Sequence, residues 1–153
     1  MLIDELITPP ILEFKGPYRF LSNFFVAELV WDNIVWPSSE HAYQAAKSLD
    51  RDVRLRFSRL PTPVSAKHAG KGVALRPDWE TVKVGVMAEI VRAKFTQNPR
   101  LKQLLIDTGD AHLEEGNTWG DRIWGVSPPG SGNGKNHLGK ILMELRAEWL
   151  PRN

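Results

Sequence analysis

The chain has 153 residues, of which 42% are hydrophobic and 25% are charged, and its formal net charge is +2. This composition is typical of a globular domain and excludes a disordered or fibrous chain, and so small a net charge does not by itself indicate nucleic-acid binding. No cysteine is present, which excludes disulfides, thiolate metal sites and a cysteine nucleophile and favours a reducing, cytoplasmic compartment. We expect a single domain over residues 1–153, with neither a signal peptide nor a membrane span.

The first elements along the chain are a predicted β-hairpin and a helix. Apolar and aromatic residues flank the turn pair Asp32-Asn33, which is typical of two antiparallel strands. Pro37 ends the hairpin, and Ser38 or Ser39 is placed to cap the helix that follows. We expect the strands at 25–31 and 34–36 and the helix from 39 to about 49.

Hydrophobic residues at helical spacing predict the remaining helices. Asp78 can cap the longest one, and Asn98 before Pro99 is typical of an N-cap with a first-turn proline. Between 109 and 139 the periodicity vanishes, and long irregular stretches of this kind tend to be functional. We expect helices at 52–59, in a turn that ends at 70, and at 79–95, 99–106 and 137–149. The sequence therefore predicts an α+β fold, a compact and mostly helical domain with a small antiparallel hairpin.

Three polar residues of the first predicted helix share one face. Glu40, Gln44 and Lys47 lie within about 60° of one another at 100° per residue. One interpretation is the solvated side of an amphipathic helix, in which Glu40 merely complements the helix dipole. The other is that Glu40 faces a pocket and stabilises positive charge at the anomeric carbon of a sugar. Lys47 would then neutralise a leaving base, bind phosphate or attack the anomeric carbon as an amine.

The irregular segment holds two further candidate sites. Trp119 and Trp124 offer stacking surfaces for a base, and Asp121 would supply a second carboxylate; alternatively, Trp-Gly-Asp is a turn with a core tryptophan. The glycine-rich run 130–136 leads into the last helix and could hold a diphosphate on its backbone N–H groups, or be a flexible loop with Asn136 as an N-cap. This run does not match a Walker A loop. The histidines lack metal-ligand spacing, so we predict no metal.

Several blocks in combination closely resemble the NADAR (YbiA-like) family. They are FKGPYRFLSNF at 14–24, WPSSEHAYQAAK at 36–47, LRPDW at 75–79, Met87, Lys94-Phe95, NTWGD at 117–121 and GNGKNHLGKILMELR at 132–146. The resemblance spans nearly the whole chain. It implies a YbiA-like, mostly helical α+β fold and N-glycosidase activity without a metal or cofactor. Known members split either a riboflavin-pathway intermediate or ADP-ribose attached to guanine in nucleic acid, and in the second role they reverse ADP-ribosylation.

The resemblance also implies site residues. Glu40, Trp119 and Asp121 match positions of the family site, and Asn23 and Asn136 match plausible ligand contacts. Lys47 or Lys67 would be the amine of a covalent sugar intermediate. Together with the residue chemistry, this predicts Glu40, Lys47 and Asp121 as catalytic and a second set as ligand-binding. That set is Asn23, Lys67, Trp119, Trp124, Gly134 and Asn136.

The expected substrate is ADP-ribose-like or nucleotide-like, possibly within a nucleic acid, and no obligate protein partner is expected. Two non-enzymatic interpretations stay open. The chain could be a module that binds ADP-ribose without hydrolysis, or Trp119, Trp124 and the proline-rich loop could form a protein-binding surface. Shorter relatives lack the stretch 122–130. Its Arg122 and Trp124 could reshape the base pocket, so substrate choice is expected to depend on this segment.

Overall fold

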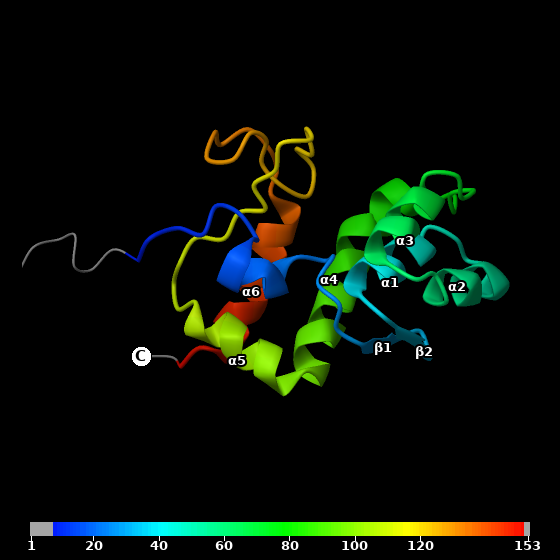
Figure 1. Ribbon diagram of the computed structural model, residues 1–153, viewed down its shortest axis with the longest axis horizontal. Coiled ribbons are helices and arrows are strands. Elements are labelled where there is room, and N and C mark those ends of the chain that lie inside the picture. The colour runs from blue at the N-terminus through cyan, green and yellow to red at the C-terminus, as the bar shows by residue number, and fades with distance from the viewer. Residues whose placement is uncertain (1–7, 152–153) are drawn as a thin grey trace, which may run out of the picture. The chain divides into compact units, whose positions relative to one another are not determined.

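The computed structural model describes residues 8–151, which fall into two compact units. The central unit is Asn23–Pro99, and the terminal unit combines residues 8–22 with 100–151. The elements are helices and one two-stranded antiparallel sheet (Figure 1), so the predicted α+β class is confirmed. Within the described residues, no helix is both long and apolar enough to cross a membrane.

The predicted hairpin is confirmed in the central unit. Strand β1 (Leu29–Trp31) pairs with β2 (Ile34–Trp36), and the two turn residues have φ of 57° and 56°, as the twist-matched two-residue hairpin turn requires. Side chains alternate across the sheet, because Leu29, Ile34 and Trp36 are buried while Val30 and Val35 are exposed. Strand β2 has the predicted bounds, whereas β1 is shorter than the predicted 25–31, since proline follows β2 and has no N–H to continue the ladder.

Helix α1 (Ser39–Ala45) contacts each of the other helices of the central unit, which are α2 (Arg51–Ser58), α3 (Pro63–Gly70) and α4 (Trp79–Gln97). Ser38 is its N-cap, with the side chain accepting from His41 N. The helix is shorter than predicted because the chain tightens into i to i−3 bonds after it and Asp50 then caps α2. Every residue of α1 is buried.

Two predicted caps have other roles. The carboxylate of Asp78 binds Arg76 at 2.6 and 3.0 Å, and no side-chain cap bond is made at the start of α4. The Asn98 amide donates to Lys94 O at 2.8 Å and to Glu28 O at 2.9 Å, so it ties the end of α4 to the segment before β1. Both helix boundaries were nevertheless predicted to within two residues, because Pro99 still opens the next helix.

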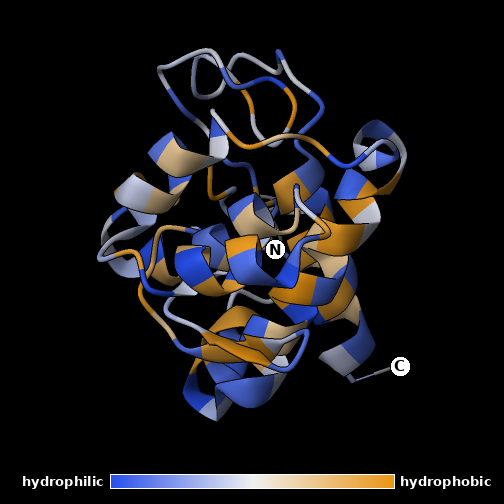
Figure 2. Ribbon diagram, turned by 90° about the vertical axis from the view of Figure 1, so that its right-hand side faces the viewer, coloured by the Kyte–Doolittle hydropathy of each residue, from blue (hydrophilic) through white to orange (hydrophobic). Residues whose placement is uncertain are grey.

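The terminal unit contains η2 (Gly16–Leu21, a 3-10 helix), α5 (Pro99–Asp107), α6 (His137–Trp149) and a long irregular loop. Parallel bridges join Ile11 to Leu113 and Gly116 to Val126. The helices carry hydrophobic residues beside hydrophilic ones (Figure 2), as the helical spacing predicted. The buried hydrophobic residues of the unit come from all three helices and both bridges: Ile11, Phe14, Phe20, Leu21, Leu101, Leu105, Ala111, Leu113, Val126, Leu138, Ile141, Leu142 and Leu145.

Candidate functional site

The predicted polar face of α1 is buried rather than solvated. Glu40 and Gln44 are each 6% exposed, and the Gln44 Nε2 atom donates to Glu40 Oε1 at 2.7 Å. Lys47, one turn beyond Gln44, is half-buried. The interpretation of this face as the solvated side of an amphipathic helix is therefore wrong, because α2, α3 and α4 surround the helix. Charged groups are rarely buried without a partner or a function.

Asn23, a predicted ligand contact, fixes the start of α1. Its Oδ1 accepts from Ser39 Oγ at 2.8 Å, and its backbone carbonyl accepts from Glu40 N at 3.1 Å. Its amide nitrogen faces the Met87 sulfur at 3.4 Å, which is a weak acceptor. Asn23 thus holds the backbone of Glu40 through its own carbonyl and holds the Ser39 hydroxyl through its buried side chain, whatever its role toward a ligand.

Lys47 lies in an environment that suits an amine nucleophile. Its Nζ atom donates to Gly70 O at 3.4 Å, a long hydrogen bond. Burial lowers the pKa of Lys47; the Glu40 carboxylate opposes this shift and the Lys83 ammonium adds to it. A lower pKa increases the fraction of neutral amine, which is the form that attacks carbon.

Lys67, the other candidate amine, belongs to α3. It is half-buried, and its Nζ atom lies 5.6 Å from the centre of the Phe24 ring, within the range of a cation–π contact. The central unit therefore contains four of the nine predicted site residues, which are Asn23, Glu40, Lys47 and Lys67. The other five, Trp119, Asp121, Trp124, Gly134 and Asn136, belong to the terminal unit.

Asp121 closes a turn in the terminal unit. Its Oδ1 accepts from Ile123 N at 3.0 Å and from Trp124 N at 2.9 Å. The buried Asn117 side chain bonds both backbone groups of Asp121, accepting from N at 3.0 Å and donating to O at 2.8 Å. The carboxylate predicted to be catalytic therefore also has a structural task.

The two tryptophans of this turn differ in exposure. Trp119 is 61% exposed, so its ring is accessible for stacking. Trp124 is half-buried and meets the His137 ring edge-on, with centroids 5.9 Å apart. Arg122, in the same stretch, donates from Nε to Ser127 O at 3.0 Å and so braces the loop.

The start of α6 is not the open anion site that the glycine-rich run predicts. The backbone N–H groups of four consecutive residues donate to carbonyls of 122–125 at 2.8 to 3.3 Å; they are Lys135, Asn136, His137 and Leu138. These four donors are not available to a diphosphate, because folding already uses them, and a diphosphate contact with the rest of the glycine-rich run stays a prediction. Gly134 has φ of 150°, and a Cβ there would lie 2.2 Å from Gly125 O, so the fold itself requires a glycine at this position.

Asn136 occupies the predicted N-cap position in the left-handed conformation, with φ of 52°, but makes no side-chain cap bond. Its Oδ1 accepts from Glu115 N at 3.1 Å, and its Nδ2 donates to Leu113 O at 2.9 Å. The side chain is 5% exposed. Asn136 therefore pins the irregular loop to the start of α6.

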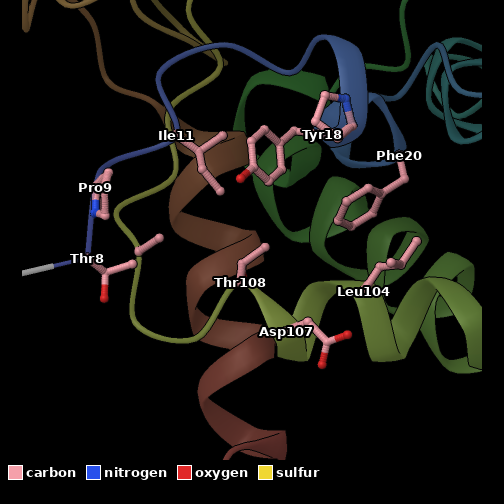
Figure 3. A pocket seen from close by; sticks show the side chains of 10 residues that line it. Thr8, Pro9, Ile11, Tyr18, Phe20, Leu104, Asp107 and Thr108 are labelled. Carbon is pink, nitrogen blue, oxygen red and sulfur yellow. The ribbon is translucent and has the colours of Figure 1, made fainter.

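A cavity of about 340 Å³ lies within the terminal unit. Figure 3 shows Tyr18 and Phe20, from η2, together with Leu104 and Asp107 of α5. None of the nine predicted site residues lines this cavity. Elsewhere in residues 8–151, no three His, Asp or Glu side chains are grouped so that they could hold a metal ion.

The family model described as NADAR domain matches residues 13–150. The chain belongs to the NADAR family. It is 42% identical to N-glycosidase YbiA of Escherichia coli (strain K12) over 151 residues, which cover 95% of this chain and 92% of that protein. It is also similar to the NMR structure of E. coli YbiA, with a TM-score of 0.80 and 39% identity over 94% of this chain and 86% of the other.

Another similar protein has a name that refers to riboflavin biosynthesis. A riboflavin biosynthesis protein of Vibrio vulnificus (strain YJ016) is 39% identical over 133 residues, which cover 86% of this chain but 35% of that protein. The predicted resemblance to NADAR is thus confirmed, and the match spans all nine predicted site residues. Gln44 and Asn117 lie within the NADAR motifs, but the sequence assigned neither of them a role in the site. In the structure Gln44 bonds the Glu40 carboxylate and Asn117 bonds the backbone of Asp121.

Proposed function

We propose that this chain hydrolyses the C–N bond between a ribosyl carbon and a base, and that it removes ADP-ribose from guanine in DNA or RNA. The chain is an N-glycosidase of the NADAR family, a class supported by the names of its relatives. The structural observation that carries the proposal is the buried Glu40 carboxylate of α1, which accepts a hydrogen bond from Gln44, while Lys47 follows two residues after the end of the helix. A fixed carboxylate stabilises positive charge that develops at an anomeric carbon.

In the proposed reaction the C–N bond breaks and its electron pair leaves with the base, which takes up a proton. Positive charge on the ribosyl carbon is stabilised by Glu40. In one route water attacks this carbon directly and loses a proton to solvent. In the other, the neutral amine of Lys47 forms a C–N bond to the carbon and loses a proton, the ribosyl C–O ring bond opens to give an imine, and water then hydrolyses this imine and returns the amine. The lowered pKa of Lys47 supports the second route.

The terminal unit is proposed to supply ligand contacts. The accessible ring of Trp119 suits stacking on a base, and Asp121 is proposed as a second catalytic carboxylate. For the diphosphate, Gly134 remains a proposed contact, whereas the first turn of α6 is no longer one because its donors are used. Trp124, half-buried against His137, is the less accessible of the two stacking candidates.

A second candidate substrate is an intermediate of riboflavin biosynthesis. The observation that favours it is the name of the Vibrio relative, whose matching segment is 39% identical to this chain. Both candidates require cleavage of a ribosyl-to-base bond, so the same α1 residues would serve either one. The difference lies in what is attached to the ribose and to the base.

One experiment tests the reaction, the substrate and the attacking group. The protein is incubated with an oligonucleotide that carries ADP-ribosylguanine and, separately, with riboflavin-pathway intermediates, and products are identified by mass spectrometry with and without borohydride. We expect free ADP-ribose from the oligonucleotide and a reduced ribosyl adduct on Lys47. An adduct on Lys67 would reassign the amine, and release of base without an adduct would favour water.

The matched variant is Glu40→Gln, which keeps the shape of the side chain and removes its charge. We expect turnover to fall about a hundredfold or more while substrate affinity changes little. Unchanged turnover would remove Glu40 from the mechanism. Cleavage of the riboflavin intermediates alone would overturn the ADP-ribose assignment.

A further inference from the structure

The Gln44 side chain lies between the Glu40 carboxylate and the backbone of Gly70. Its Nε2 donates to Glu40 Oε1 at 2.7 Å. On the other side of the amide, Oε1 faces the end of α3, where a Cβ built on Gly70 would be 1.8 Å from this oxygen and 2.6 Å from Cδ. Gln44 is 6% exposed, so the amide is enclosed between the carboxylate and the glycine.

The amide oxygen of Gln44 is buried and has no hydrogen-bond partner among the described residues. Such an orphan acceptor costs about 1–3 kcal/mol, and native proteins keep few of them. Turning the amide over would not remove the cost, because it would place the oxygen against the Glu40 carboxylate and forfeit a charge-assisted hydrogen bond. The unsatisfied oxygen is thus the consequence of aiming the NH₂ group at Glu40.

Gly70 has an ordinary backbone conformation, since its φ does not lie in the left-handed region. The backbone alone would therefore accept alanine at this position. What excludes a methyl group is the far end of the Gln44 side chain. Gly70 is needed for the position of that amide and not for the path of the chain.

We infer that Gln44 is a positioning residue that holds the Glu40 carboxylate in its reactive orientation, and that Gly70 provides the space in which the Gln44 amide is held. The inference rests on the proposed function, in which Glu40 stabilises charge on the ribosyl carbon. Gln44 acts through Glu40 and not on the substrate. A methyl group at residue 70 is therefore expected to act on turnover from the end of a different helix.

The test compares Gly70→Ala with Gly72→Ala, a matched control two residues away. A Cβ at Gly72 has Ala69 O as its nearest neighbour, at 4.0 Å, so this substitution displaces nothing. Both changes stiffen the unfolded chain to a similar extent. We expect Gly70→Ala to lower kcat roughly 10- to 100-fold, the equivalent of one lost hydrogen bond to a charged group, with little change in KM. Gly72→Ala should match the wild type.

Gln44→Ala and the double variant Gln44→Ala/Gly70→Ala separate displacement of the amide from general damage. If Gly70→Ala acts by moving Gln44, the methyl group has no further effect once Gln44 is gone, and the double variant equals Gln44→Ala. Additive losses would overturn the inference, as would wild-type kcat in Gly70→Ala.

Gln44→Glu adds a readout that a purely structural role would not move. It sets two carboxylates at hydrogen-bond distance, so one of them stays protonated to higher pH, and the acid limb of the pH–rate profile should move upward. Glu40→Gln in the same series distinguishes failure of the proposed function from failure of the positioning inference. If it retains activity, the proposed role of Glu40 fails; if it is inactive while the Gln44 and Gly70 variants are normal, the positioning inference alone fails.

A measurement without substrate completes the test. The side-chain NH₂ signals of Gln44 in a ¹⁵N-labelled protein are identified by their loss in Gln44→Ala. They should shift in Gly70→Ala and stay in place in Gly72→Ala. Unchanged signals in Gly70→Ala would overturn the inference even if neither substrate were cleaved.

Discussion

Replacing Asn136 by alanine is expected to destabilise the protein and not simply to weaken ligand binding. The substitution leaves Glu115 N and Leu113 O without their partner, at distances now 3.1 and 2.9 Å. Each orphaned buried group costs about 1–3 kcal/mol, and alanine at φ of 52° adds roughly 1 kcal/mol, because its Cβ crowds the backbone there. These contributions sum to about 3–7 kcal/mol in the free energy of unfolding, and we expect a loss in the lower half of that range because the bond from Glu115 N is only partly buried.

Thermal and urea unfolding measure this loss. For a domain of this size each kcal/mol corresponds to about 2–4 °C in Tm, so Asn136→Ala should melt roughly 10 °C lower than the wild type. Asn133→Ala is the matched control, because Asn133 is exposed in the same loop and its backbone N–H and C=O, which alanine retains, bond Ser131 Oγ and Ser127 N. Asn136→Gly should recover about 1 kcal/mol, the part due to the left-handed backbone.

Three results would contradict this prediction. If Asn136→Ala melts with the wild type, the two side-chain bonds do not hold the loop. If it melts normally and loses affinity for the ribosyl ligand, Asn136 is a ligand contact, as the family resemblance implies. If Asn136→Gly is no more stable than Asn136→Ala, the strain assigned to the left-handed backbone is wrong.

Three further predictions each test a single feature of the structure. Asp121→Asn keeps an acceptor for Ile123 N and Trp124 N, so the free energy of unfolding should change by less than about 1 kcal/mol. Turnover should fall if the negative charge is catalytic, and normal turnover in a steady-state assay would make Asp121 structural. Asn33→Val, at φ of 56°, should cost about 1–2 kcal/mol in urea unfolding while Asn33→Gly costs nothing; equal stability of the two would contradict the turn assignment. Burial lowers the pKa of Lys94 to about 7, so the unfolded chain binds one more proton than the folded chain above that pH, and the free energy of unfolding should rise by about 2 kcal/mol between pH 7 and 9. Lys94→Met should lack this rise, and parallel pH curves for the two proteins would show that Lys94 is not the group responsible.

Features set by neighbouring residues could be predicted from the sequence. The Asp32-Asn33 turn, the Ser38 cap and the start of α5 at Pro99 each depend on a few adjacent residues, so local conformational preference suffices. The role of Asn98 could not be predicted in this way, because it depends on a bond to a segment distant in the sequence, Glu28 O.

The burial of the α1 face marks the limit of sequence reasoning about the site. Helical spacing correctly placed Glu40, Gln44 and Lys47 together, but it favoured a solvated face, because spacing carries no information about which helices pack around α1. The contact of Gln44 with Gly70 joins residues 26 positions apart. A glycine at the end of a helix is ordinarily explained as a terminator, so no sequence signal pointed to its steric role.

The buried polar residues of the NADAR motifs differ in whether their hydrogen bonds offset the free-energy cost of burial. Asn136 and Asn117 lose solvation, but their side chains bond backbone groups that would otherwise be orphaned, so folding alone accounts for them. Burying a charged amine costs more free energy than burying an amide, and the 3.4 Å hydrogen bond from Lys47 to Gly70 O offsets little of that cost. The Gln44 amide nitrogen bonds Glu40, while the amide oxygen is buried without a hydrogen-bond partner among the described residues. Stability does not explain this arrangement, whereas the proposed chemistry of Glu40 and Lys47 does, so the proposal of catalysis rests on these two residues before any residue of the irregular loop.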